Sequence, residues 1–123
     1  MNIRVAIIDD DQSVRKSLSR LLRVMHMETV GYSSAEAFIE DPNRVQFDCL
    51  LLDVQLGGMT GLELQQHLKA EQYPVPIIFI TAFEDPLAQA RAEQIGCAGF
   101  FHKTDPGARI IGAIRELAER VAE

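Results

Sequence analysis

The sequence lacks the features of several common protein classes. It has no apolar stretch long enough to span a membrane, and its N-terminus lacks the basic segment and apolar core of an export signal. We therefore expect a cytoplasmic protein that makes no membrane contact. The net charge of −6 argues against a nucleic-acid surface on this domain, because phosphate contacts need clustered Lys and Arg.

Cysteine is also scarce. The two cysteines, Cys49 and Cys97, lie far apart and form no Cys-x-x-Cys pair. We interpret them as small reduced side chains of a cytosolic protein. Internal repeats, low-complexity tracts and linkers are absent as well, so residues 1–123 are expected to form a single domain with one core.

Four short apolar runs, at residues 3–8, 49–52, 76–80 and 99–102, give the clearest structural signal. Runs of this kind are typical of strands that are buried on both faces of a parallel sheet. A fifth strand is expected near 28–32. Each of the four runs stops at a polar residue, and these are Asp9, Asp53, Thr81 and Lys103.

Helical patterns fill the segments between the runs. Apolar spacing predicts helices near 14–25, 61–71, 85–95 and 106–121, and a capping box at 33–36 predicts a short helix through Ile39. The alternation of five strands with five helices implies a parallel sheet covered on both faces. The fourth helix is rich in alanine, and we expect it to be the least firmly anchored.

The carboxyl ends of parallel strands meet at one edge of the sheet, which is where open α/β sheets place their ligands. Helix capping explains one or two acids of the Asp9-Asp10-Asp11 tripeptide, but not the arrival of Asp53 beside them. Two carboxylates about 4 Å apart repel by about 4 kcal/mol at an effective dielectric of about 20, so cations are needed. Lys103 supplies one charge. Oxygen ligands without His or Cys favour Mg²⁺, before Ca²⁺, for the rest.

This combination suits phosphoryl transfer. A carboxylate can attack phosphorus to form an aspartyl phosphate, while the metal and Lys103 neutralise the phosphoryl oxygens. The Thr81 hydroxyl can donate a hydrogen bond to the new group. Taken singly, Thr81 and Lys103 would be ordinary strand-end and surface residues. Their convergence with the acids favours a functional interpretation.

Four motifs, in order and at matching spacing, resemble those of the receiver domains of bacterial two-component response regulators. They are Ile-Ile-Asp-Asp-Asp at 7–11, Leu-Leu-Leu-Asp-Val-Gln-Leu-Gly-Gly-Met-Thr-Gly at 50–61, Ile-Phe-Ile-Thr-Ala at 78–82 and Gly-Phe-Phe-His-Lys at 99–103. The resemblance covers the whole chain. It implies a flavodoxin-like, doubly wound α/β fold with strand order 2-1-3-4-5. Segments 14–18 and 33–38 look closest to receivers of LuxR-type regulators, which control transcription through a helix-turn-helix output domain. The sequence alone fits a single-domain protein as well as the receiver of such a regulator.

The resemblance also assigns roles. Asp53 would be the phosphoacceptor, and the remaining roles are Asp10 as direct metal ligand, Asp9 as a ligand mainly through water, Gln55 as a backbone-carbonyl ligand, Thr81 as switch hydroxyl, Phe100 as switch aromatic and Lys103 as phosphate partner. The implied cofactor is Mg²⁺ and the implied phosphodonor is a sensor histidine kinase. A receiver–receiver dimer through the fourth helix, fifth strand and fifth helix would follow phosphorylation. We expect self-phosphorylation from small donors and slow autodephosphorylation, but not a turnover enzyme.

Three residues depart from the pattern of the family. Thr104 replaces a proline that often follows the lysine, and we expect the Lys103–Thr104 bond to be trans. Gly57 replaces a common proline in the loop after Asp53 and should loosen it. Phe100 stands where tyrosine is frequent, so no outward hydroxyl bond is available.

Three other functions are known for α/β proteins of similar topology. A haloacid-dehalogenase-type phosphatase needs a second aspartate two residues after the nucleophile, where this chain has Gln55. A nicotinamide enzyme needs a glycine-rich turn after the first strand, where the chain has its aspartates. The remaining alternative is a pseudo-receiver, an interaction module of the same fold that works without phosphorylation.

Overall fold

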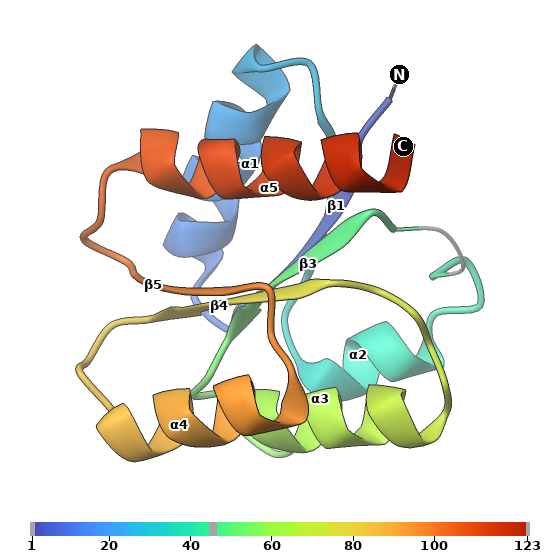
Figure 1. Cartoon of the computed structure of the whole chain (residues 1–123), viewed down its shortest axis with the longest axis vertical. Helices are drawn as coiled ribbons and strands as arrows, with labels where there is room; N and C mark the ends of the chain where they lie inside the picture. Colours follow the sequence, from blue (N-terminus) through green and yellow to red (C-terminus); the bar gives the residue numbers. More distant parts are fainter. Residues whose placement is uncertain (1, 45–46, 123) are drawn as a thin grey trace.

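The computed structural model describes residues 2–44 and 47–122, and five strands alternate with five helices along these residues. In chain order they are β1 (Arg4–Ile8), α1 (Gln12–Val24), β2 (Glu28–Tyr32), α2 (Ala35–Glu40), β3 (Cys49–Asp53), α3 (Gly61–Ala70), β4 (Ile77–Thr81), α4 (Pro86–Ile95), β5 (Gly99–His102) and α5 (Gly107–Ala122). All strand pairs are parallel, in the order β2-β1-β3-β4-β5. Helices α1 and α5 cover one face of the sheet, and α2, α3 and α4 cover the other (Figure 1). The predicted fold class and strand order are confirmed.

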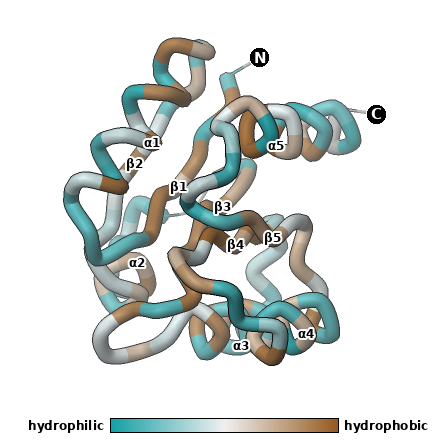
Figure 2. Tube along the Cα trace, turned by 90° about the vertical axis from the view of Figure 1, so that its left-hand side faces the viewer, coloured by the Kyte–Doolittle hydropathy of each residue, from teal (hydrophilic) through white to brown (hydrophobic). Residues whose placement is uncertain are grey.

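The central strands explain why the apolar runs do not alternate. Every residue of β3 and β4 is buried. Leu50 and Leu52 pack into the core on the α2–α3–α4 side, whereas Leu51 packs into the core beneath α1 and α5. Both faces of the sheet therefore need apolar side chains, and hydrophobic residues concentrate along β1, β3 and β4 between the helix layers (Figure 2).

The structure contradicts the predicted capping box at the start of α2. Ser34 is the N-cap, one residue later than the box requires, and its hydroxyl accepts from the third helical N–H. Glu36 therefore sits one position too early to reach the cap, and its carboxylate instead accepts a hydrogen bond from Met59 N–H, at 3.1 Å. A true capping box occurs at α3, between Thr60 and Glu63.

Helix α4 buries only two small side chains, Ala88 and Ala92, as its alanine-rich sequence predicts. Two hydrogen bonds from α3 side chains hold it, because Gln65 Nε2 donates to the Ala92 carbonyl and Lys69 Nζ to the Ile95 carbonyl, each at 3.1 Å. The described residues contain no cis peptide bond, so the expected trans Lys103–Thr104 bond is confirmed.

Candidate functional site

The sheet brings four of the predicted site residues together at its carboxyl edge. Asp9 follows β1 and Asp53 ends the adjacent strand β3, where Ile8 is in register with Leu52. One carboxylate oxygen from each of Asp9, Asp10 and Asp53 lies within 4.8 Å of the others. Asp9 and Asp53 are 0% and 4% exposed, whereas Asp10 is open to solvent. Two buried acids and one accessible acid therefore face a common point.

Lys103, which follows β5, counters the charge of the two buried acids. Its Nζ lies 3.0 Å from Asp53 Oδ2 and 2.9 Å from Asp9 Oδ2. The contact with Asp53 is a hydrogen bond. The contact with Asp9 is an ion pair, and Asp9 Oδ2 has no hydrogen-bond partner among the described residues. The single ammonium group of Lys103 therefore contacts both carboxylates but forms a hydrogen bond with Asp53 only.

Backbone amides hold the other oxygen of each buried acid. Asp11 N–H donates to Asp9 Oδ1 at 2.9 Å, and Gln55 N–H donates to Asp53 Oδ1 at 3.1 Å. The Oδ2 atoms are left for cations. A buried carboxylate oxygen without a directed donor, beside two more oxygen ligands and no His or Cys, fits a hard divalent ion such as Mg²⁺.

Burial changes the ionisation of the central pair. Desolvation is the main cause that raises the pKa of Asp53, and the charge of Asp9 adds to it, against the hydrogen bonds from Lys103 and Gln55 N–H. For Lys103, desolvation works to lower the pKa, but the bonds and charges of the two acids outweigh it and raise the pKa. Lys103 therefore stays protonated, while the surroundings of Asp53 disfavour its ionised form.

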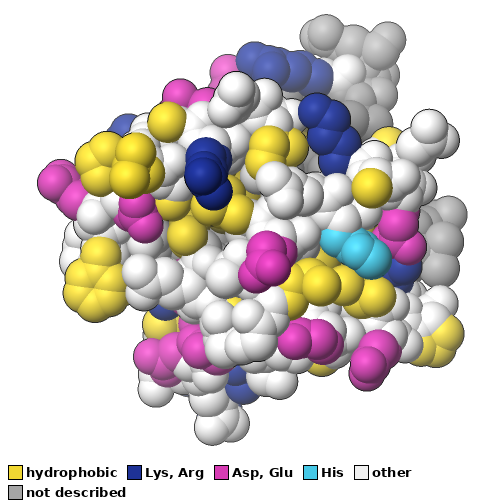
Figure 3. Space-filling model, turned by 90° about the horizontal axis from the view of Figure 1, so that it is seen from below, with side chains coloured by type: hydrophobic (Ala, Val, Ile, Leu, Met, Phe, Trp, Pro, Cys, Tyr) yellow, Lys and Arg dark blue, Asp and Glu magenta, His cyan; other side chains and the backbone are white. Residues whose placement is uncertain are grey.

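Thr81 and Phe100 lie on the neighbouring strands β4 and β5, where Phe100 is in register with Phe79, two residues before Thr81. Thr81 is 1% exposed, and its hydroxyl donates to the Phe83 carbonyl at 3.1 Å. The Phe100 ring is partly buried and packs on Phe79, with ring centroids 5.9 Å apart. Beyond them, Phe83 and Leu87 are 63% and 80% exposed at the start of α4. The face seen from the α3–α4 side mixes hydrophobic and acidic side chains (Figure 3).

Arg15 is a neighbour of the site to which the sequence assigned no role. Its Nη1 donates to the Asp9 carbonyl at 2.6 Å, so α1 fixes the backbone that carries this acid. The Arg15 stem passes over Gly31 on β2, where an added Cβ would make an ordinary contact 3.5 Å from Arg15 Cδ. Helical periodicity gives no signal for a side chain that bonds a carbonyl six residues earlier.

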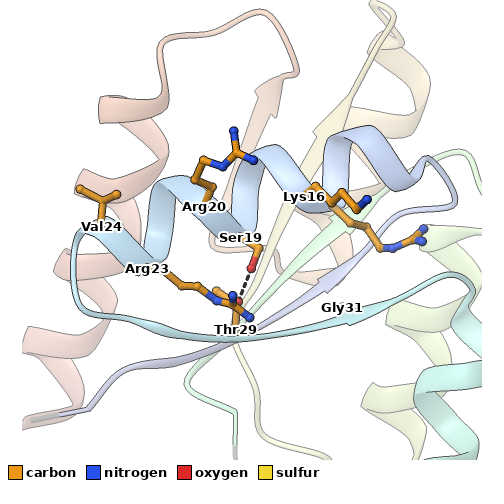
Figure 4. A pocket seen from close by; sticks show the side chains of 8 residues that line it. Lys16, Ser19, Arg20, Arg23, Val24, Thr29 and Gly31 are labelled. Carbon is orange, nitrogen blue, oxygen red and sulfur yellow. Dashed lines mark hydrogen bonds between the residues drawn. The ribbon is translucent and has the colours of Figure 1, made fainter.

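A hollow of about 600 Å³ lies elsewhere, between α1 and the edge strand β2 (Figure 4). Arg15, Lys16, Arg20 and Arg23 line it, and Ser19 and Thr29 share a hydrogen bond of 2.5 Å across it. Lys16, Arg20 and Arg23 take part in no ion pair within residues 2–44 and 47–122. The hollow does not include the acidic cluster, so it is separate from the candidate phosphoryl-transfer site.

Comparison with known proteins agrees with this geometry. Residues 5–115 match the family described as response regulator receiver domain. The chain is 38% identical, over 90% of its length, to the response regulator protein TodT of Pseudomonas putida F1, and 34% identical, over 99%, to the transcriptional regulatory protein FixJ of Azorhizobium caulinodans. It spans 49% of TodT and 58% of FixJ, which is about half of each relative.

Solved structures give the same result. A crystal structure titled FixJ-N superposes with a TM-score of 0.88 at 31% identity, covering 97% of this chain and 95% of that one. The response regulator StyR superposes with a TM-score of 0.87 at 36% identity, covering 99% of this chain and 64% of that one. The chain therefore belongs to the receiver domains of response regulators, the signalling modules of two-component systems. No helix in the described part of the chain is long and apolar enough to cross a membrane.

Proposed function

We propose that Asp53 accepts a phosphoryl group from the phosphohistidine of a sensor histidine kinase, with Mg²⁺ as cofactor. The observation that supports this assignment is the environment of Asp53. It is the buried carboxylate to which Lys103 donates a hydrogen bond, and carboxylate oxygens of two further acids lie within 4.8 Å of one of its own. A site of this kind can hold both a nucleophile and the cations that phosphoryl transfer requires.

The reaction forms one bond and breaks one. An Asp53 carboxylate oxygen forms an O–P bond while the P–N bond of the donor breaks, and the imidazole leaves with the electron pair and takes up a proton. The Lys103 ammonium lies within reach of Asp53 and stays protonated, so it can neutralise a phosphoryl oxygen as charge moves onto it. Gln55 N–H keeps the carboxylate oriented throughout.

The proposed metal ligands are Asp10 and Asp53, the Gln55 carbonyl and, through water, Asp9. Bound Mg²⁺ would supply positive charge that draws the phosphoryl oxygens and the carboxylates together. Asp10 is exposed and can meet a hydrated ion, while Asp9 is held by Asp11 N–H and Arg15 behind it. The protein's own part is to fix these oxygens at the edge of the sheet.

The readout that we propose uses Thr81 and Phe100. Thr81 would turn its hydroxyl to the phosphoryl group, and the partly buried Phe100 ring would move into the vacated space. Weakly held α4 would shift with them, and the α4–β5–α5 face would then pair with a second receiver. The pseudo-receiver alternative is disfavoured, because the acids and Lys103 contact one another as phosphorylation requires.

Intact-mass spectrometry tests the assignment. Acetyl phosphate with Mg²⁺ should add one phosphoryl group to the parent and none to Asp53→Asn, and EDTA should prevent the addition. An Asp53→Asn protein that still gains the mass would refute Asp53 as the acceptor. Transfer of a radiolabelled phosphoryl group from an autophosphorylated sensor histidine kinase, with Asp53→Asn as control, tests the proposed donor.

A further inference from the structure

The loop that joins β3 to α3, residues 54–60, buries Val54 and Leu56 in the core, at 6% and 8% exposed, whereas the two glycines at its tip have no side chain to bury. It contains no proline. A Cβ at Gly57 would meet nothing within 4 Å, and Gly58 has a φ of +75°, a conformation that glycine adopts freely. Yet this loop carries Gln55, whose N–H holds Asp53. A contact from outside the loop can hold the glycine tip, which has no side chains of its own to pack.

Glu36 from α2 supplies that contact. Its Oε2 accepts a hydrogen bond from Met59 N–H at 3.1 Å. Gly58 packs so closely on the same carboxylate that a Cβ there would clash with Oε2. The other oxygen, Oε1, is buried and has no hydrogen-bond partner among the described residues. A buried carboxylate oxygen without a hydrogen bond is costly even in a half-buried residue such as Glu36, and Ser34 already caps α2, so capping does not explain Glu36.

We propose that Glu36 is a positioning residue of the phosphoryl-transfer site. By bonding Met59 across Gly58 it holds the 54–60 loop, and with it Gln55, in the arrangement that binds Mg²⁺. At the base of the loop, Gly61 N–H donates to the Val54 carbonyl at 3.0 Å and Thr60 N–H donates to Glu63 Oε1 at 3.0 Å, and Glu36 adds a tie near the tip. This inference rests on the proposed function of Asp53.

Three variants of the full chain test it. Glu36→Ala removes the tie, Glu36→Gln keeps an oxygen acceptor for Met59 N–H, and Glu40→Ala is the matched control, because Glu40 is an exposed acid on the same helix. Glu36→Ala should speed amide hydrogen exchange at Met59 and weaken Mg²⁺ binding, measured by calorimetry, about tenfold, the lower end for outer-shell partners of metal sites. Phosphorylation by acetyl phosphate should slow at low Mg²⁺ and recover at saturating Mg²⁺. Glu36→Gln should restore both properties.

A second experiment perturbs the same contact between Glu36 and Gly58 from the loop side. Gly58→Ala should displace the Glu36 carboxylate, so the double variant Glu36→Ala/Gly58→Ala should bind Mg²⁺ more tightly than the sum of the two single effects predicts. The proposal is overturned if Glu36→Ala matches Glu40→Ala in Met59 exchange and in Mg²⁺ affinity. A parent that gains no phosphoryl group would refute the proposed function instead, while the exchange and affinity measurements still decide the role of Glu36.

Discussion

Removing the charge of Asp10 should stabilise the protein without metal and reduce what Mg²⁺ adds. Asp10, Asp9 and Asp53 present oxygens within 4.8 Å of one another. Two charges at that distance repel by about 3.5 kcal/mol at an effective dielectric of about 20 and by about 0.9 kcal/mol in bulk water. Asp10 is exposed, so the lower value applies. We expect Asp10→Asn to gain about 1 kcal/mol in EDTA, which raises the melting temperature by about 3–4 °C.

Magnesium should stabilise Asp10→Asn less than it stabilises the parent. At ten times its dissociation constant, an ion that binds only the native parent adds about 1.4 kcal/mol, and Asp10→Asn should gain clearly less. Thermal unfolding followed by circular dichroism, with EDTA and then with millimolar Mg²⁺, gives both numbers. Glu40→Gln, an exposed acid away from the cluster, controls for net charge. If Asp10→Asn melts lower in EDTA, or gains as much from Mg²⁺ as the parent, the metal-site reasoning fails.

Three further predictions concern Asp53, Thr81 and the Phe100 switch. Because folding raises the pKa of Asp53, this group favours the folded state below its ordinary pKa and loses that contribution as pH rises through the raised value. The stability of the parent minus that of Asp53→Asn should therefore fall with rising pH in EDTA, and a flat difference in urea titrations would contradict the shift. Thr81→Ala should phosphorylate but fail to dimerise by light scattering, whereas Thr81→Ser should retain dimerisation; equal dimerisation would exclude the hydroxyl. Beryllofluoride with Mg²⁺ should alter amide exchange across residues 85–101, and changes confined to the loops around Asp53 would refute the Phe100 switch.

The strands and the acidic cluster were predictable because both follow from short-range signals. An unbroken apolar run such as Leu50 to Leu52 demands burial on both faces, and a parallel sheet then forces the strand-end residues Asp9, Asp53 and Lys103 to one edge. The strand order came from the resemblance to a family, not from periodicity. What Lys103 contacts was not predictable in detail, because its choice of both acids depends on the length of its stem and the position of β5.

Contacts between distant segments account for the main error and the main omission. The residues around Glu36 fit a local cap, but the carboxylate bonds Met59, 23 residues away, which no local pattern specifies. The same holds for Arg15, which donates to the Asp9 carbonyl six residues earlier, a pairing that helical periodicity does not specify. Tertiary packing decides which of several possible partners a polar side chain bonds. The sequence alone does not rank those partners.

The Thr81 hydroxyl has one proton and two uses. In this structure it donates that proton to the Phe83 carbonyl, which anchors the start of the β4–α4 connection. A hydroxyl that turned to a phosphoryl group would have to give up this bond. A neutral hydrogen bond contributes about 1 kcal/mol, or about a fivefold change in population. Under the proposed switch, the same proton would stabilise the resting form through Phe83 and the phosphorylated form through the phosphoryl group, so a variant at Thr81 would alter both forms.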